Sequence, residues 1–275
     1  SFSTFRQIDF TGSTCNPGAQ TIQCHGFTLA SGGTYTATTF ATIDPGTITY
    51  TGKSISTLNV NNTSGVTTLG DAGQNATLTL TNGTLDLAGF TLTNTTTAQT
   101  ATGTKNLTFN GGTLACAGGS LAWLNASPTG FTTTAGTGTG TISMTSASTK
   151  KFTGGGSTYN CTLNQGGAGA LTITGSNTFN DITNTTQPAS VLFTAGTTNT
   201  FNNFSLSGTA GNLITIGSDI AAQHTLSKSS GTVSVSYCTI SYSNATGGAA
   251  WNAFTSNGNV DGGNNTGWDF GGVTY

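Results

Sequence analysis

The sequence predicts an all-β protein folded as a parallel β-helix, a β-solenoid with about 20–29 residues in each coil. Three observations lead to this fold class. The composition favours strands, apolar residues alternate with threonine, and one motif recurs at nearly constant spacing. Together they predict short strands that wind around one continuous core.

The composition is typical of ordered short strands joined by tight turns. Charged residues make up 5% of the 275 residues, with no Glu, against about a quarter in average proteins. Disordered chains are rich in charge and Pro, whereas this chain has 4 Pro, 15 Phe and 34% hydrophobic residues. Thr, Val, Ile, Phe and Tyr favour strands, while the 41 Gly, together with Asn, suit the corners between them.

Apolar residues recur at every second position along most of the chain. In a strand, this period places Leu and Ile on one face and Thr on the other. The segments with this pattern are ISTLNV (55–60), ATLTLTNGTLDLAGFTLTN (76–94), NLTFNGGTLACAGGSLAWL (106–124), ALTITG (170–175), NLITIG (212–217) and TVSVSYCTISYS (232–243). No segment has a convincing helical stripe.

A Thr-aromatic-Asn motif recurs at intervals of 20 and 22 residues. These intervals are too long for the strands of a hairpin meander, and they fit one coil of a parallel β-helix. Equivalent residues of successive coils lie about 4.8 Å apart, so repeated side chains stack on one another. We therefore predict a structural ladder of an inner aromatic row (Tyr159, Phe179 and Phe201) and a row of asparagines at the next corner (Asn160, Asn180 and Asn202).

The two ends of the chain differ in composition from its middle. Residues 1–30 hold Arg6, two Cys and a Pro, and residues 246–275 hold Trp251 and Trp268 among Gly and Asn. A coil stack leaves unpaired strand edges at its ends. We therefore predict an N-terminal cap or junction at 1–30, a β-solenoid at 31–245 and a C-terminal cap at 246–275. Because the chain begins without Met, we expect that it is processed or is a fragment of a longer protein.

The five cysteines cannot all pair within one chain. Cys15 and Cys24 flank a predicted turn, and their spacing allows a local disulfide or two separate thiols. Cys116, Cys161 and Cys238 lie in strand-like segments, where we expect them to pack as small hydrophobic side chains. Cys15, Cys24 and His25 lack a second close pair with zinc spacing, so we predict no metal and no cofactor.

The scarcity of charge excludes several classes of partner. Six basic residues in the whole chain do not make a phosphate-binding surface, so we predict no nucleic-acid binding. No apolar run of about 18 residues occurs, so we predict no membrane insertion. A nearly uncharged surface instead suits an extracellular location or the surface of a virion.

Four stretches of the second half are similar to a known kind of protein: KKFTGGGSTYNCTLNQGG, GSNTFNDIT, LSKSSGTVSVSYCTISYSNATGGAAWN and DGGNNTGWDF. They resemble right-handed parallel β-helix regions of bacteriophage tail-fibre and other virion proteins, and of bacterial surface adhesins. The first half resembles these proteins only in the general character of its sequence. The resemblance implies a right-handed β-solenoid outside a cell or on a virion, and it implies no catalytic residue.

We therefore predict a non-catalytic structural or adhesive segment of a virion or cell-surface fibre. Its expected partners are further copies of itself in a trimer or filament, other fibre or virion subunits, or cell-surface polysaccharide. Trp123, Trp251 and Trp268 are candidate platforms for sugar rings, although packing in the core or a cap explains each of them as well.

Two alternatives belong to other functional classes. An ice-binding protein would use rows of threonine, and Thr-x-Thr occurs at 47–49, 91–93, 100–104 and 137–141. A polysaccharide-degrading enzyme on a β-helix would need clustered carboxylates, and here the eight Asp are scattered along the sequence. We therefore predict that the protein is not an enzyme.

Overall fold

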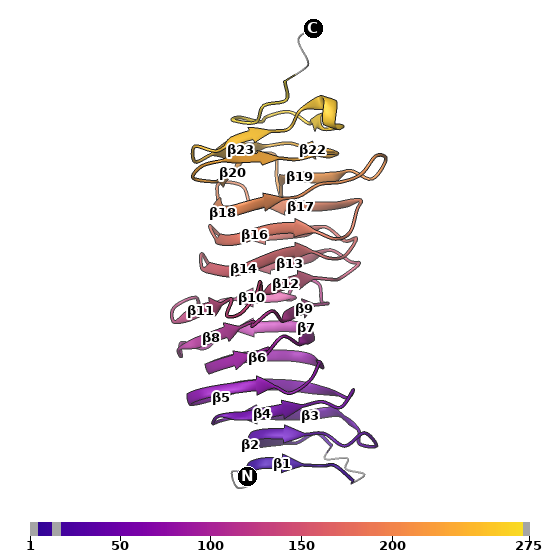
Figure 1. Ribbon diagram of the computed structural model, residues 1–275, viewed down its shortest axis with the longest axis vertical. Helices are drawn as coiled ribbons and strands as arrows, with labels where there is room; N and C mark the ends of the chain where they lie inside the picture. Colours follow the sequence, from indigo (N-terminus) through magenta and orange to yellow (C-terminus); the bar gives the residue numbers. More distant parts are fainter. Residues whose placement is uncertain (1–4, 13–17, 272–275) are drawn as a thin grey trace. The chain divides into compact units, whose positions relative to one another are not determined.

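The computed structural model describes residues 5–12 and 18–271, and these residues are almost entirely strand and turn. They form parallel strands stacked coil upon coil, so the predicted β-solenoid fold is confirmed (Figure 1). One short 3₁₀ helix, η1 (Thr255–Asn257), is present. Among the described residues, no helix has the length and hydrophobicity needed to cross a membrane.

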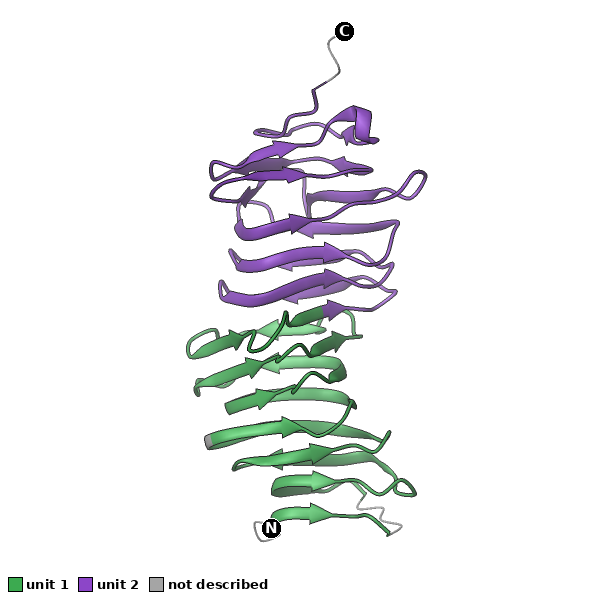
Figure 2. Cartoon of the chain, viewed as in Figure 1, with its two compact units in different colours: residues 1–142 green, residues 143–275 purple. Residues whose placement is uncertain are grey.

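The chain divides into two compact units, residues 1–142 and 143–275 (Figure 2). The strands of unit 1 are β1 (Phe5–Asp9), β2 (Thr21–Thr28), β3 (Tyr35–Thr42), β4 (Gly46–Thr49), β5 (Ser54–Leu69), β6 (Gly73–Asp86), β7 (Thr91–Gln99), β8 (Lys105–Thr108), β9 (Thr113–Cys116), β10 (Trp123–Asn125) and β11 (Phe131–Thr134). Strand β12 (Thr141–Met144) runs across the division between the units.

Long strands of unit 1 bend around a corner and pair with two strands of the preceding coil. The first part of β5 pairs in parallel with β3, and its last part pairs with β4. Strand β6 then pairs with both parts of β5, placing Leu58 beside Leu78. Both leucines are fully buried. The alternation of apolar residues with Thr thus builds the inner rows of the coil stack, as period two requires.

Unit 2 repeats this arrangement with shorter strands. They are β13 (Lys150–Thr153), β14 (Thr158–Gln165), β15 (Leu171–Thr174), β16 (Thr178–Asn184), β17 (Ala189–Phe193), β18 (Thr198–Ser205), β19 (Ile214–Ser218), β20 (His224–Ser227), β21 (Thr232–Ser234), β22 (Cys238–Ile240), β23 (Ser243–Thr246), β24 (Ala250–Asn252) and β25 (Val260–Asp261). Two ladders run through the unit, one from β14 to β16, β18, β20 and β23, the other from β13 to β15, β17, β19, β22 and β25.

The repeated aromatic residues form one column inside unit 2. Tyr159 stacks on Phe179 with ring centroids 5.3 Å apart, and Phe179 stacks on Phe201 at 5.7 Å. The ring planes differ by 16° and 15°, and each side chain is at most 1% exposed. These rings follow the strand registers of β14, β16 and β18, so the 20- and 22-residue intervals correspond to single coils.

The asparagines that follow these rings are arranged less regularly. Asn202 Nδ2 donates a hydrogen bond to Asn180 Oδ1 at 3.3 Å, across adjacent coils. Asn160 lies where the register between β14 and β16 shifts, between Tyr159 and Thr162. The bulge gives β14 an extra residue relative to β16 and displaces the ladder at that point.

Two lysines are buried at corners of the coils, which the sequence did not indicate. Lys105 of unit 1 donates to the backbone oxygens of Ala101, Gly103 and Thr129. Lys150 of unit 2 donates to those of Ser146, Gly167 and Gly169, at 3.0, 3.1 and 2.5 Å. Both residues are at most 1% exposed. Each ammonium group thus pairs carbonyl groups that a turn would otherwise leave unsatisfied.

The predicted cap boundaries stay a prediction. Within residues 1–30, β1 and β2 already pair in parallel, and β2 continues into β3 and β4 of the coil stack. Within residues 246–275, β24 pairs with β21, and β25 pairs with β22.

Candidate functional site

A polar pocket lies where the β-ladder of unit 2 opens at strand β18. Strand β16 pairs with β18 as far as Ser205, whereas β20 pairs with β18 only over Thr198–Thr200. After β20 the chain turns away at 228–231 and forms β21, which pairs with β24 in a separate two-stranded sheet. The last residues of β18 therefore face an opening where the next coil would otherwise add a strand.

This opening, which we call the β18 pocket, has a volume of about 560 Å³. Its lining comes from β16, β18 and β21, from the residue Ser207 just after β18 and from the turn before β21, and it is polar apart from Phe204. Phe204 is 6% exposed and packs edge-on against the indole of Trp251, with ring centroids 5.6 Å apart. The pocket thus has an aromatic wall and an otherwise hydroxyl-rich lining that includes Ser207, Thr232 and Ser234.

Asp181 is the carboxylate of the β18 pocket. Its two oxygens accept a hydrogen bond from Ser205 Oγ, at 3.2 and 3.4 Å. Burial raises the pKa of Asp181, while the hydrogen bonds from Ser205 and the Ile182 backbone and the charge of Lys228 act in the opposite direction. The carboxyl group is half-buried and keeps unused acceptor sites, because a carboxylate offers about four.

Lys228 is the cation of the pocket, and the coil that follows holds its backbone in place. Its N–H donates to Thr246 O and its carbonyl accepts from Ala249 N, both at 3.1 Å. Gly247 has a φ of +95°, and a Cβ there would lie 2.4 Å from the Lys228 oxygen. The ammonium group donates to the backbone oxygen of Asn202, at the unpaired edge of β18.

Asp181 and Lys228 do not form a direct ion pair. Within the described ranges the one ion pair closer than 4.0 Å joins His25 and Asp44 of unit 1, at 3.3 Å. The pocket therefore presents the Asp181 carboxylate as a hydrogen-bond acceptor and the Lys228 ammonium group as a cationic donor, and the two groups do not contact each other. Their charges balance, so the site favours a neutral ligand over an anion or a metal ion.

A row of threonines crosses five strands of unit 1 that pair one after another: β2, β3, β5, β6 and β7. Register pairing places these residues side by side from β2 to β7, and they alternate with inward side chains, so they face outward. We call them the threonine row: Thr21, Thr39, Thr57, Thr77 and Thr96. Neighbouring hydroxyl groups repeat at the strand spacing, about 4.8 Å.

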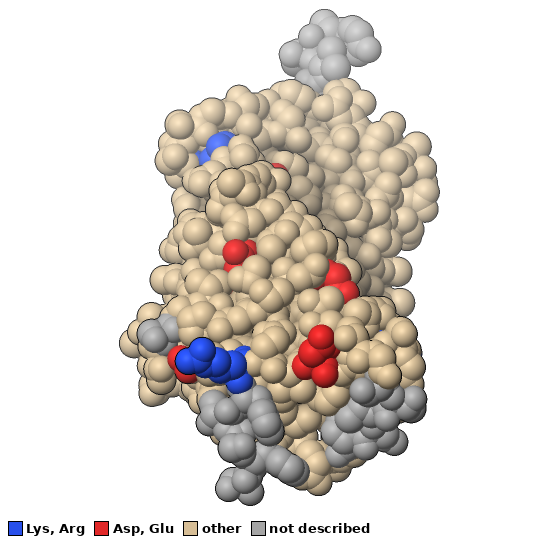
Figure 3. Space-filling view, turned by 60° about the horizontal axis from the view of Figure 1, so that its bottom comes forward, with Lys and Arg blue, Asp and Glu red and all other residues tan. Residues whose placement is uncertain are grey.

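Unit 2 carries a comparable outward row across β14, β16, β18, β20 and β23. It consists of Thr158, Thr178, Thr200, Ser227 and Thr246. Charged side chains are few on the face shown in Figure 3, where a basic group and an acidic group meet at one place and the others lie apart. Both units therefore present regular hydroxyl groups on a nearly uncharged surface.

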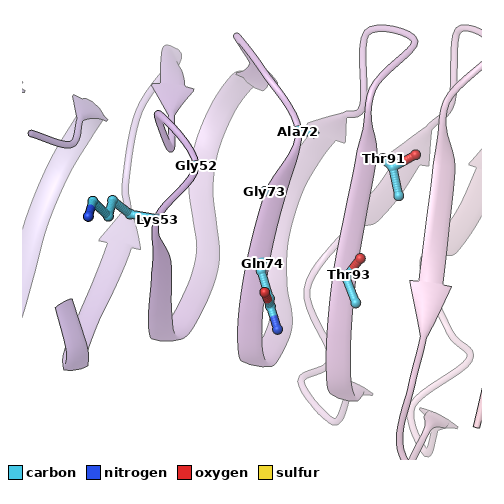
Figure 4. Close-up of a pocket in the computed structure, with 7 residues that line it drawn as sticks. All are labelled: Gly52, Lys53, Ala72, Gly73, Gln74, Thr91 and Thr93. Carbon is cyan, nitrogen blue, oxygen red and sulfur yellow. The ribbon is translucent and has the colours of Figure 1, made fainter. Parts of the chain in front are cut away.

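The Thr-x-Thr motifs of the sequence do not make up the threonine row. Thr91 and Thr93 line a small hollow of about 220 Å³ in unit 1, together with Gln74 and Lys53 (Figure 4). Gln74 and Thr93 are register partners on β6 and β7, and the Lys53 ammonium points away from them (Figure 4). The motif at 137–141 lies mostly in the turn before β12.

The three tryptophans are packed inside. Trp123, Trp251 and Trp268 are 0%, 3% and 9% exposed. Trp251 and Trp268 meet edge-to-face at 5.0 Å, and their Nε1–H groups donate to Thr246 O and Ser243 Oγ. At these positions an indole does not offer an open face to a sugar, because neighbouring side chains cover it.

The described cysteines are buried in the core. Burial raises the pKa of the Cys24, Cys116 and Cys238 thiols to about 12, and Cys161 is 2% exposed. Cys15 lies outside the described residues, so the disulfide between Cys15 and Cys24 stays a prediction. In the described parts of the chain, no three His, Cys, Asp or Glu residues come together as a metal site.

Comparison of the chain with protein families, curated proteins and solved structures gave no match.

Proposed function

We propose that this chain is a non-catalytic structural and adhesive segment of a virion or cell-surface fibre, located outside the cell or on the virion surface. Its partner would be an uncharged, hydroxyl-rich polymer such as a cell-surface polysaccharide, or further subunits of the same fibre. The observation that carries this proposal is the threonine row, a regular line of hydroxyl groups on a surface with almost no charge.

The chemistry of the row suits such a partner. Each hydroxyl group both donates and accepts hydrogen bonds, and it can rotate to suit its neighbour. A stacked coil holds the row rigid, so little conformational entropy is lost when a polymer lies along it. Individual contacts of this kind are weak, and their repetition along the coils adds avidity.

The test is binding of the full chain to a panel of neutral and acidic polysaccharides. We expect binding to a neutral member, and we expect the double variant Thr57→Lys/Thr77→Lys to lose most of it. The matched control is Thr137→Lys/Thr139→Lys, which places the same charges in an exposed turn. Retention of binding by the row variant, or no binding by the original chain, contradicts an adhesive role of the row.

Self-association has a separate readout. Size exclusion with light scattering, followed by electron microscopy of the same fractions, would detect a trimer or filament. A monomer at all concentrations would contradict the proposal that the chain is a subunit of a fibre. Only the proposed binding to a polymer would then remain.

Ice binding is the second candidate, because the same row repeats one hydroxyl group at each coil. Evenly spaced hydroxyl groups on a rigid face can hold water molecules at repeated positions. Thermal hysteresis of the original chain that disappears in Thr57→Lys/Thr77→Lys, without polysaccharide binding, would favour this candidate over adhesion.

A further inference from the structure

We propose that the β18 pocket is a saccharide site, in which adjacent hydroxyl groups of one sugar ring donate to Asp181 and accept from Lys228. The inference rests on the proposed function, since it assumes a hydroxyl-rich partner, and it assigns a discrete site in unit 2 apart from the threonine row.

Hydrogen-bonding capacity is the first argument. An ammonium group has three N–H donors, and Lys228 gives one to Asn202 O. The Asp181 carboxylate accepts from Ser205 Oγ and from the Ile182 backbone, which leaves lone pairs free. A vicinal diol provides the complementary pair, because one hydroxyl group donates while its neighbour accepts.

The balance of charge is the second argument. An anionic ligand would meet the Asp181 carboxylate, and a metal ion would meet the Lys228 ammonium group, whereas a neutral ligand is repelled by neither. The remaining polar lining consists of hydroxyl and amide groups, among them Ser207, Thr232 and Ser234. These groups donate and accept in turn, as sugar hydroxyl groups do.

The shape of the opening is the third argument. Its volume of about 560 Å³ falls in the range of roughly 300–1,000 Å³ that is usual for ligand pockets. Phe204 contributes an apolar wall beside the hydroxyl groups. The opening also results from a specific backbone feature, the departure of the chain from the ladder after Ser227.

A purely structural role for the same residues makes a different prediction. If Lys228 only pairs the edge carbonyl of Asn202, and Asp181 only anchors Ser205, then water alone fills the pocket. Changes at the two charged residues would then alter stability without affecting any ligand.

The experiment uses the full chain and a panel of methyl glycosides of glucose, galactose and mannose. Saturation-transfer NMR detects binding, and isothermal titration measures the affinity. We expect at least one glycoside to bind, and Asp181→Asn to weaken its affinity about tenfold or more, because a hydrogen bond to a charged group is lost. Ser234→Trp, which fills the exposed side of the pocket, should abolish binding without touching the charged pair.

Thr137→Lys/Thr139→Lys, in an exposed turn of unit 1, is the control, and it should bind the glycoside as the original chain does. Urea midpoints close to that of the original chain show that the pocket variants are folded. The inference is overturned if no glycoside binds. It is also overturned if Asp181→Asn and Ser234→Trp bind the glycoside with the same affinity as the original chain. If Thr57→Lys/Thr77→Lys loses polysaccharide binding while the pocket variants keep it, the saccharide site in the β18 pocket is overturned and the proposed function still stands.

Discussion

The aromatic column of unit 2 predicts a large and local loss of stability in Phe179→Ala. Phe179 is 1% exposed and stacks on Tyr159 and Phe201, and it also lies 5.5 Å from the ring of Phe152. Truncating a buried Phe to Ala costs about 3–5 kcal/mol, and each stacked ring pair contributes about 0.5–1.5 kcal/mol of interaction. We therefore expect the free energy of unfolding to fall by about 3–5 kcal/mol.

The assay is equilibrium unfolding in urea, followed by far-UV circular dichroism. Phe90→Ala is the matched control, because Phe90 is 37% exposed and its loss should cost less than about 1 kcal/mol. Phe179→Leu should fall between the two, since it keeps most of the buried volume and loses the stacking. Equal losses in Phe179→Ala and Phe90→Ala would refute the argument that the column holds neighbouring coils together.

Two further predictions concern buried titratable groups. Lys150→Met should lower the free energy of unfolding of unit 2 by a few kcal/mol, because each buried carbonyl group left unpaired costs about 1–3 kcal/mol. Lys151→Met is the control at the exposed neighbouring position, and it should change the urea midpoint little. Burial lowers the pKa of His224 to about 4 from 6.5, so the unfolded chain binds more protons between these values. Stability should therefore fall by up to roughly 3 kcal/mol as the pH drops from about 6.5 to about 4. His224→Phe should remove this part of the pH dependence. If the urea midpoints of the variant and of the original chain change with pH in the same way, His224 is not its cause.

Much of the interior follows from the sequence because the core repeats once per coil. The intervals between Tyr159, Phe179 and Phe201 equal the coil length, so stacked rings follow from the period alone. The buried positions of Lys105 and Lys150 do not follow, because a lysine is usually exposed. The burial of each depends on carbonyl groups of the turn just before it and of the corresponding turn one coil later.

The surface was harder to predict than the core. The threonine row uses one Thr from each coil, at intervals of 18 to 20 residues, whereas the Thr-x-Thr motifs that the sequence offers lie elsewhere. A search for single Thr residues at the coil period would have found it. The β18 pocket has no comparable signal, because it depends on where β20 stops pairing with β18, and on the turn that carries Lys228 across the gap.

The threonine row calls for an explanation beyond strand propensity. Thr is β-branched and favours strands, so a strand-rich chain contains many of them for conformational reasons alone. The next outward row on the same strands provides an internal comparison, because it experiences the same backbone. That row is mixed: Gln23, Ala41, Asn59, Thr79 and Ala98, of which Ala41 is buried. The core does not fix the identity of outward side chains. Five threonines in one row and a mixture in the next are therefore the pattern expected if the row contacts a regular polymer or an ordered layer of water, as we propose.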